Sequence, residues 1–124
     1  MKQTSLHFGL LIMRLGVSGS MLIHGYGKAS KIFVGDFSFG DPIGIGPYAS
    51  LILCAFAEFI APIFIILGWK TRWFSTVASI NMIVAAFIAH AGDPFAKREK
   101  AILFLIIFTF LCFSGSGKYS LDKQ

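Results

Sequence analysis

The sequence carries little charge for its length. Only 14% of its 124 residues are charged, while 56% are hydrophobic, and the mean hydropathy is +0.75. A soluble domain usually has about 25% charged and about 45–50% apolar residues, and a small domain exposes much of its surface. A chain this short cannot hide such an excess of apolar residues from water. We therefore expect an integral membrane protein in contact with the lipid bilayer.

Cysteine is also scarce, and redox motifs are missing. The two cysteines, Cys54 and Cys112, lie singly inside apolar runs, and there is no Cys-x-x-Cys pair. This spacing excludes a thioredoxin-like dithiol. Burial explains both side chains, and sulfur transfer through either is a weaker alternative. Because no flavin or iron–sulfur motif is present, the chain by itself cannot run redox chemistry.

The charges that are present are mostly basic and give a net charge of +5. They gather at the ends of apolar runs, as at Lys70 and Arg72. Contact with lipid headgroups explains this placement better than nucleic acid, so no nucleic-acid partner is expected. The two predicted membrane faces carry equal numbers of basic residues. If Lys28 is set aside as a site residue, the count favours cytoplasmic termini.

Long apolar runs predict four membrane-spanning helices. A span needs about 20 mostly apolar residues, and residues 8–27, 48–69 and 73–91 each supply one. The fourth span, residues 99–115, has a shorter apolar part and needs its charged start to reach the interface by snorkelling. Short connections predict an all-α, polytopic, up-down four-helix bundle that forms one domain over residues 1–124.

The first connection, residues 30–47, differs from the others. Its glycines, two prolines and alternating phenylalanines argue against a regular helix. It is too apolar for a solvated loop, and irregular backbone in a membrane must be covered by protein or water. We expect an interfacial or partly re-entrant segment.

A few polar side chains interrupt or flank the spans and are the candidate ligand or proton site: Arg14, His24, Lys28, Glu58, Asn81, His90, Asp93 and Glu99. Measured from the face that holds the termini, Arg14 and Glu58 lie at depths of roughly 9 and 16 Å at 1.5 Å per residue. An unpaired charge in hydrocarbon costs at least about 2.5–3.5 kcal/mol. We therefore predict that Arg14 and Glu58 pair inside the bundle with Asn81 nearby. Both a register-fixing structural pair and a functional pair stay open.

His24 and His90 are predicted to form a second polar layer, at roughly 24 and 25 Å on the same scale. Lys28 follows His24 by one turn, and Asp93 and Glu99 flank the same level. Three interpretations of the histidines stay open: structural hydrogen bonding, a proton or ligand site, and, as the weakest, haem ligation between two helices. No metal site is expected.

Pro62 follows Glu58 by four residues. A proline at this position removes a helical hydrogen bond and clashes with the carbonyl of residue 58, so the second span should kink there. An ionisable side chain beside a broken turn in a membrane is typical of a ligand or proton site. A purely architectural role for Pro62 stays open.

Four stretches of the chain together resemble the DoxX family of small bacterial membrane proteins: LIMRLGVSGSMLIHGYGK, AEFIAPIFIILGWKTRW, IAHAGDPFAKREKAILFL and GSGKYSLD. The resemblance covers about residues 11–122, apart from a longer first connection. It implies a four-helix protein of the bacterial cytoplasmic membrane. The founding relatives are subunits of a thiosulfate:quinone oxidoreductase, so the resemblance also implies a redox-associated role with quinone as a candidate ligand. It fixes no catalytic residue.

Three functions fit these features, and whether the chain catalyses a reaction stays open. The favoured one is a membrane subunit of a quinone-linked redox complex, in which the ionisable residues supply protons and Arg14 stabilises charge. Phenylalanines would line the apolar slot: Phe56, Phe59 and Phe87. The second is a carrier or binding module for a small polar or anionic molecule, which would need a homo-oligomer to form a path. The third is a non-catalytic assembly partner.

Overall fold

The computed structural model describes residues 3–36, 44–89 and 92–122, and the regular structure within them is helical throughout. The first span is α1 (Gln3–Phe33). The second joins α2 (Pro47–Ala55), the π-helix η1 (Phe56–Ile60) and α3 (Ala61–Leu67). The third joins α4 (Thr71–Ile83) and the π-helix η2 (Val84–Ala89), and the fourth is α5 (Phe95–Ser114). The predicted all-α, four-helix architecture is confirmed.

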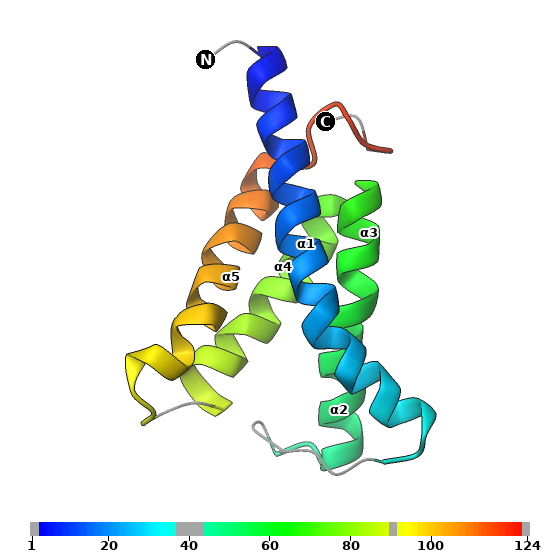
Figure 1. Cartoon of the computed structure of the whole chain (residues 1–124), viewed down its shortest axis with the longest axis vertical. Coiled ribbons are helices and arrows are strands. Elements are labelled where there is room, and N and C mark those ends of the chain that lie inside the picture. The colour runs from blue at the N-terminus through cyan, green and yellow to red at the C-terminus, as the bar shows by residue number, and fades with distance from the viewer. Residues whose placement is uncertain (1–2, 37–43, 90–91, 123–124) are drawn as a thin grey trace.

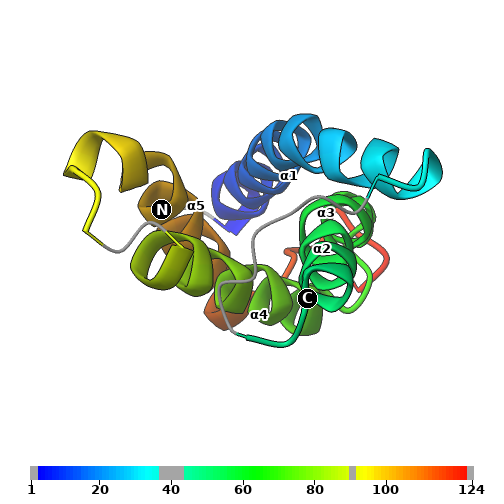
Figure 2. The same cartoon turned by 90° about the horizontal axis from the view of Figure 1, so that it is seen from below.

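The spans run up and down, and both ends of the described chain lie at the same end of the bundle (Figure 1). Seen along the bundle from below, α1, α2–α3, α4 and α5 surround a common centre (Figure 2). The closest pairings are α4 with α5 and α1 with the second span. α1 and α5 approach each other near the termini and diverge toward the opposite end (Figure 1).

Three helical segments are long and apolar enough to cross a membrane: Gln3–Phe33, Pro47–Leu67 and Thr71–Ile88. The described part of the chain is thus that of a helical membrane protein. α5 begins with charged residues, in line with the short apolar part expected of the fourth span. Side chains such as Ile23 and Phe33 are 77% and 88% exposed, which is how lipid-facing residues appear when the chain is viewed alone.

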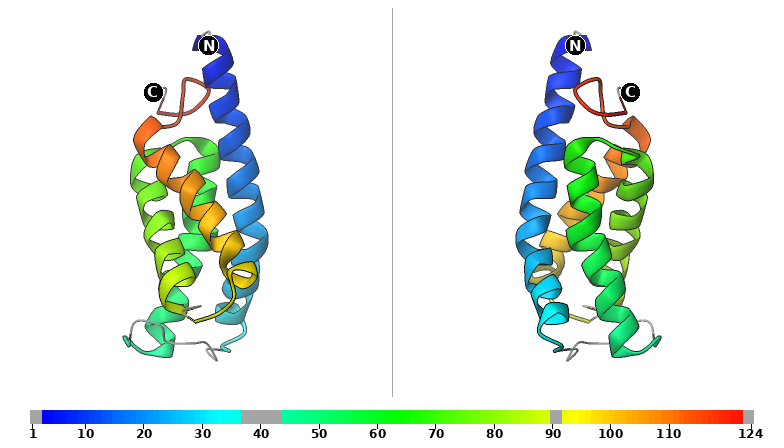
Figure 3. Two further views of the ribbon diagram at one scale, coloured as in Figure 1. Left: turned by 90° about the vertical axis from the view of Figure 1, so that its left-hand side faces the viewer. Right: turned by 90° about the vertical axis from the view of Figure 1, so that its right-hand side faces the viewer.

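The boundaries of the first span differ from the prediction. α1 begins at Gln3 instead of about residue 8, and Figure 3 shows it projecting beyond the other spans at the termini end. It also continues to Phe33, which makes the start of the predicted 30–47 connection helical. Residues 37–43 of that connection lie outside the described part. Its interfacial or re-entrant placement stays a prediction.

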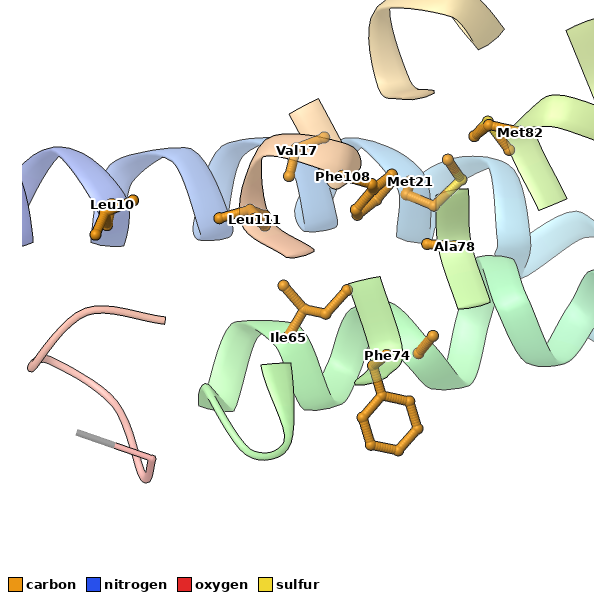
Figure 4. Close-up of a cluster of buried hydrophobic side chains, with 10 residues drawn as sticks. Leu10, Val17, Met21, Ile65, Phe74, Ala78, Met82, Phe108 and Leu111 are labelled. Atoms are coloured by element: carbon orange, nitrogen blue, oxygen red, sulfur yellow. The ribbon is translucent and has the colours of Figure 1, made fainter. Parts of the chain in front are cut away.

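The core is a band of apolar side chains drawn from all four spans (Figure 4). On α1 it uses Leu10, Val17 and Met21, whose spacing of seven and four residues places them on one helix face. Phe108 on α5 is fully buried against this band. The inward side of α1 also carries the buried Arg14, so polar groups lie next to this apolar band.

The second span changes its helical geometry next to Pro62, where a kink is predicted. The π-helical turn η1 comes directly before α3, and Pro62 occupies the first turn of α3. The missing N–H of a proline interrupts the regular hydrogen-bond ladder, and π turns in α-helices are frequent at functional sites. Glu58 lies in the middle of this π-helical turn.

Candidate functional site

The polar site is built around the carboxylate of Glu58, which is 6% exposed. Lys28 on α1 places its Nζ 2.8 Å from Oε1 of Glu58. Asn81 on α4 donates from Nδ2 to the other oxygen, Oε2, at 2.9 Å. Both carboxylate oxygens therefore have a partner, and the three side chains come from three different spans. This Lys28–Glu58–Asn81 group is called the polar cluster below.

Close helix packing holds the polar cluster together. A Cβ atom on Gly25 would lie 2.0 Å from the backbone oxygen of Glu58, so only glycine fits at this position of α1. Small residues let membrane helices approach closely, since hydrocarbon supplies no hydrophobic drive for their association. The contact brings α1 against the π-helical turn and sets Lys28, three residues further along, within reach of Glu58.

A cavity of about 170 Å³ adjoins the polar cluster. Its ionisable lining consists of His24, Lys28, Glu58 and Lys100, and Phe104 closes it on the α5 side. The ring of His24 meets the ring of Phe104 edge-on, with centroids 6.0 Å apart. The cavity thus combines an anion, two cations and an imidazole with an apolar wall.

A wider groove runs between α1 and α5, with a volume of about 520 Å³. Gly16 and Ser20 line it on α1, while Lys100, Leu103 and Phe104 line it on α5. Lys100 and Phe104 line both the groove and the cavity beside Glu58, so the two spaces are adjacent. A lipid-soluble molecule in this groove would lie with one end next to the polar cluster.

The predicted Arg14–Glu58 pair is wrong. Arg14 is fully buried, but its guanidinium donates to the backbone oxygens of Ile65 at 2.9 Å, Ile66 at 2.8 Å and Tyr119. The first two belong to the last turn of α3, where carbonyls lack the usual helical donor, and that of Ile65 also accepts the N–H of Gly68 at 3.0 Å. Arg14 therefore closes the end of α3 and ties the C-terminal segment to the bundle.

Helix register and side-chain direction explain this error. The depth scale started α1 at residue 8, whereas α1 projects past the other spans. Arg14 consequently lies level with Ile65, and Gly25 lies level with Glu58. Helical side chains also lean toward their own N-terminus. On antiparallel spans, Arg14 and Glu58 lean apart, while Lys28 leans back toward Glu58.

The other predicted site residues divide into three groups. His24, Lys28, Glu58 and Asn81 lie at the cavity or the cluster. Glu99 is exposed and lines the α1–α5 groove instead. Asp93 precedes α5 and is not among the residues that line the cavity, while His90 lies outside the described residues. Any partnership of the two histidines, and with it haem ligation between them, stays untested.

The predicted slot formed by Phe56, Phe59 and Phe87 stays a prediction. Phe104 provides the aromatic wall of the cavity. Phe56 lines another, apolar pocket between the second and third spans, which also includes Asn81 of the polar cluster. The guanidinium carbon of Arg98 lies 5.3 Å from the centre of the Phe87 ring. Among the described residues, no three His, Cys, Asp or Glu side chains group closely enough to hold a metal ion.

Sequence reasoning missed Lys100, Phe104 and the C-terminal contacts. Lys100 belongs to a basic run at the start of a span, a pattern typical of headgroup anchors. The available signal was its spacing from Phe104, which is four residues and places both on one helix face. The GSGKYSLD stretch carried no sign that it folds back over α3 and α4.

The fold and site define a class: a helical membrane protein whose bundle contains a lysine–glutamate pair, with an asparagine bonded to the glutamate, near a groove between α1 and α5. The chain belongs to the DoxX family, whose profile matches residues 9–91. This match covers the first three spans and all three members of the polar cluster, a narrower extent than the predicted 11–122.

One relative is a protein of Haemophilus influenzae described as uncharacterized. It is 28% identical over 126 residues, an alignment that covers 93% of the present chain and 89% of the relative. No solved structure matches the chain. The relative thus shares the length of the whole bundle, including the fourth span that the family profile leaves out.

Proposed function

We propose that this protein is a membrane subunit of a quinone-linked redox complex and that the polar cluster is its quinone-head and proton site. The main supporting observation is that the α1–α5 groove adjoins the cavity beside Glu58, since Lys100 and Phe104 line both. A quinone combines a polar ring with a long apolar tail. The cavity matches the ring in polarity, and the groove matches the tail.

The chemistry of the cluster supports proton handling. Reduction of a quinone makes its oxygens strong hydrogen-bond acceptors and takes up protons. Lys28 and Lys100 carry donatable protons beside the cavity, and the Glu58 carboxylate can hold one between turnovers. His24 adds an imidazole, which can donate or accept a hydrogen bond at the cavity. The Lys28 side chain is 26% exposed, so the cluster is not fully enclosed by the bundle.

Electrons must come from elsewhere in such a complex. The chain contains no flavin or iron–sulfur motif, so a partner subunit that carries a redox cofactor would supply them. The proposal places the chain in the bacterial cytoplasmic membrane with cytoplasmic termini. Reporter fusions to Gln124 test that orientation: activity of a cytoplasmic reporter is expected, and activity of an exported one would contradict it.

Direct binding tests the proposal. A short benzoquinone with a decyl tail is titrated calorimetrically into the protein in detergent micelles. Saturable binding is expected, and Glu58→Gln should weaken it at least about tenfold because a charged hydrogen-bonding group is lost. Gly16→Leu serves as a groove variant, since a side chain there enters open space and should block the tail. Unchanged binding in both variants would contradict the proposal.

A second candidate function has its own supporting observation. Lys28, Lys100 and His24 surround the small cavity, a composition that also suits a small anion. This is the carrier or binding-module alternative, and a homo-oligomer would provide the path. Uptake of small anions into proteoliposomes is compared between the wild type and Lys100→Met. Equal uptake by the two would contradict the carrier function. It would leave the quinone proposal standing, because that proposal is tested by binding.

A further inference from the structure

A second pocket lies at the termini end of the bundle, remote from the polar cluster. Its volume is about 530 Å³, and it is formed where the short turn after α3 leads into α4. Its walls include the rings of Trp69 and Trp73, and its polar lining includes Lys70, Arg72 and Asp122. Two indole rings and two cations at the ends of two membrane spans are typical of the lipid–water interface.

The one acidic side chain that lines this pocket, Asp122, accepts hydrogen bonds from the backbone. Oδ1 of Asp122 accepts the N–H of Lys70 at 2.9 Å, and Oδ2 accepts the N–H of Thr71 at 2.9 Å. Asp122 thus serves the first turn of α4 and leaves the side chains of Lys70 and Arg72 without a carboxylate partner among the described residues. The pocket keeps an excess of positive charge.

The pocket is also held in a fixed shape. Among the non-glycine residues that the structure describes, only Lys70 has a positive φ, 49°. A left-handed conformation costs free energy for a residue with a side chain and persists only where the surroundings impose it. Here the surroundings are Asp122 and the hydrogen bonds of Leu121 and Asp122 N–H to the carbonyls of Leu67 and Gly68. The Lys70 ammonium lies 5.1 Å from the centre of the Trp69 ring.

We propose that this pocket binds the phosphate group of an anionic phospholipid, independently of the quinone function. Lys70 and Arg72 supply the charge, and a guanidinium pairs with phosphate oxygens in a bidentate fork. The two tryptophan rings supply an amphipathic wall suited to the glycerol region of a lipid. Asp122 offsets one of the positive charges of Lys70 and Arg72, so the pocket keeps a net positive charge toward a phosphate.

The two tryptophans are the only ones in the sequence and both line the pocket, so intrinsic fluorescence reports on it directly. The protein is reconstituted in phosphatidylcholine vesicles in which a fraction of lipid is replaced by brominated phosphatidylglycerol or, in parallel, brominated phosphatidylcholine. Quenching by the anionic lipid should exceed that by the zwitterionic lipid by about fivefold per cation at low salt. Equal quenching by both lipids would overturn the proposal.

Matched variants separate a specific pocket from general surface charge. Arg72→Gln should reduce the preference for the anionic lipid about fivefold, and Lys70→Gly, which tolerates the positive φ, should do the same. Arg98→Gln makes the same charge change at the opposite end of the bundle and should leave the preference intact. An equal loss with Arg98→Gln would overturn the proposal.

A soluble phosphate ester tests the source of the phosphate. Glycerophosphate is added in excess to vesicles that contain brominated phosphatidylglycerol. If the lipid is the ligand, its quenching should persist, because the ester lacks the acyl chains that hold the lipid at the interface. Relief of quenching at glycerophosphate concentrations similar to that of the lipid would overturn the assignment to a membrane lipid.

Discussion

Arg14 and Glu58 are two buried charges of this bundle that are stabilised in different ways, and the contrast distinguishes a structural residue from a candidate functional one. Arg14 is fully buried and gives its guanidinium to three backbone carbonyls. Glu58 is buried to a similar degree but is held by two side chains, Lys28 and Asn81. Backbone carbonyls cannot change protonation state, whereas the members of the lysine–glutamate pair can.

Their surroundings differ in the same sense. Arg14 is sealed under the C-terminal segment, where Tyr119 covers it and no cavity adjoins it among the pockets described above. Glu58 borders a cavity that adjoins the groove between α1 and α5. An ionisable residue inside a membrane is a functional-site hypothesis by default, and a ligand or proton must also be able to reach it. We therefore interpret Arg14 as a structural residue and Glu58 as the centre of the proposed site.

The largest expected effect comes from removing the structural charge. Arg14→Leu leaves the carbonyls of Ile66 and Tyr119 without a donor, at about 1–3 kcal/mol each. The carbonyl of Ile65 keeps the N–H of Gly68. The free energy of unfolding should therefore fall by about 4 kcal/mol. Denaturation in mixed detergent micelles, followed by circular dichroism, measures it. Arg14→Lys keeps the charge but lacks the forked donors, so its free energy of unfolding should lie between those of the wild type and Arg14→Leu. A loss of unfolding free energy in Arg14→Leu that is smaller than in every variant of the polar cluster would contradict the structural role of Arg14.

The next effect concerns the polar cluster and should be asymmetric. Lys28→Met leaves a carboxylate that is 8% exposed at its side chain without its cation, which should cost about 3 kcal/mol. Combining it with Glu58→Leu removes both charges and should restore most of that stability. The same micelle denaturation provides the double-mutant cycle. If the two substitutions simply add, the pair makes no energetic coupling and the geometry is wrong.

A smaller effect should follow at the helix contact that positions the cluster. Gly25→Ala introduces a Cβ at 2.0 Å from the Glu58 carbonyl oxygen and should destabilise the bundle by about 1–3 kcal/mol. Gly16→Ala is the matched control, because no atom lies within 4 Å of its added Cβ. Thermal unfolding of both variants should show the loss in Gly25→Ala alone; equal midpoints would argue against close contact of α1 and η1.

The smallest effect is expected at the C-terminal segment. Asp122→Ala removes the acceptor for two backbone N–H groups at the start of α4, comparable to the loss of a helix cap, and should cost about 1 kcal/mol. Hydrogen exchange at Lys70 and Thr71 should accelerate while exchange in α5 stays unchanged. Unaltered exchange at those two amides would show that the segment does not hold α4.

The helices and the burial of the charges could be predicted from the sequence, because both follow from the bilayer as a solvent. Runs of apolar residues mark the spans, and the cost of a bare charge in hydrocarbon turns Arg14 and Glu58 inward. An interruption of the helix around Pro62 could also be predicted, because a proline lacks the N–H of the hydrogen-bond ladder. The predicted form was a kink, whereas the structure has the π-helical turn η1 directly before α3.

The partners of the charges could not be predicted in the same way. A depth scale requires knowing where each span starts, and α1 begins earlier than its apolar run. The acceptors of Arg14 are backbone carbonyls, which every residue has, so no side-chain pattern identifies them. Lys100 was missed for a related reason: a lysine that anchors a helix and a lysine that faces a cavity share one sequence pattern.

The most direct test of the central claim is a binding comparison between the two charged centres. The decyl benzoquinone is titrated into Glu58→Gln and Arg14→Lys, each verified as folded by circular dichroism. We expect Glu58→Gln to lose at least about tenfold in affinity and Arg14→Lys to bind like the unaltered protein. Full affinity in Glu58→Gln, or loss confined to Arg14→Lys, would contradict the assignment of the site to Glu58.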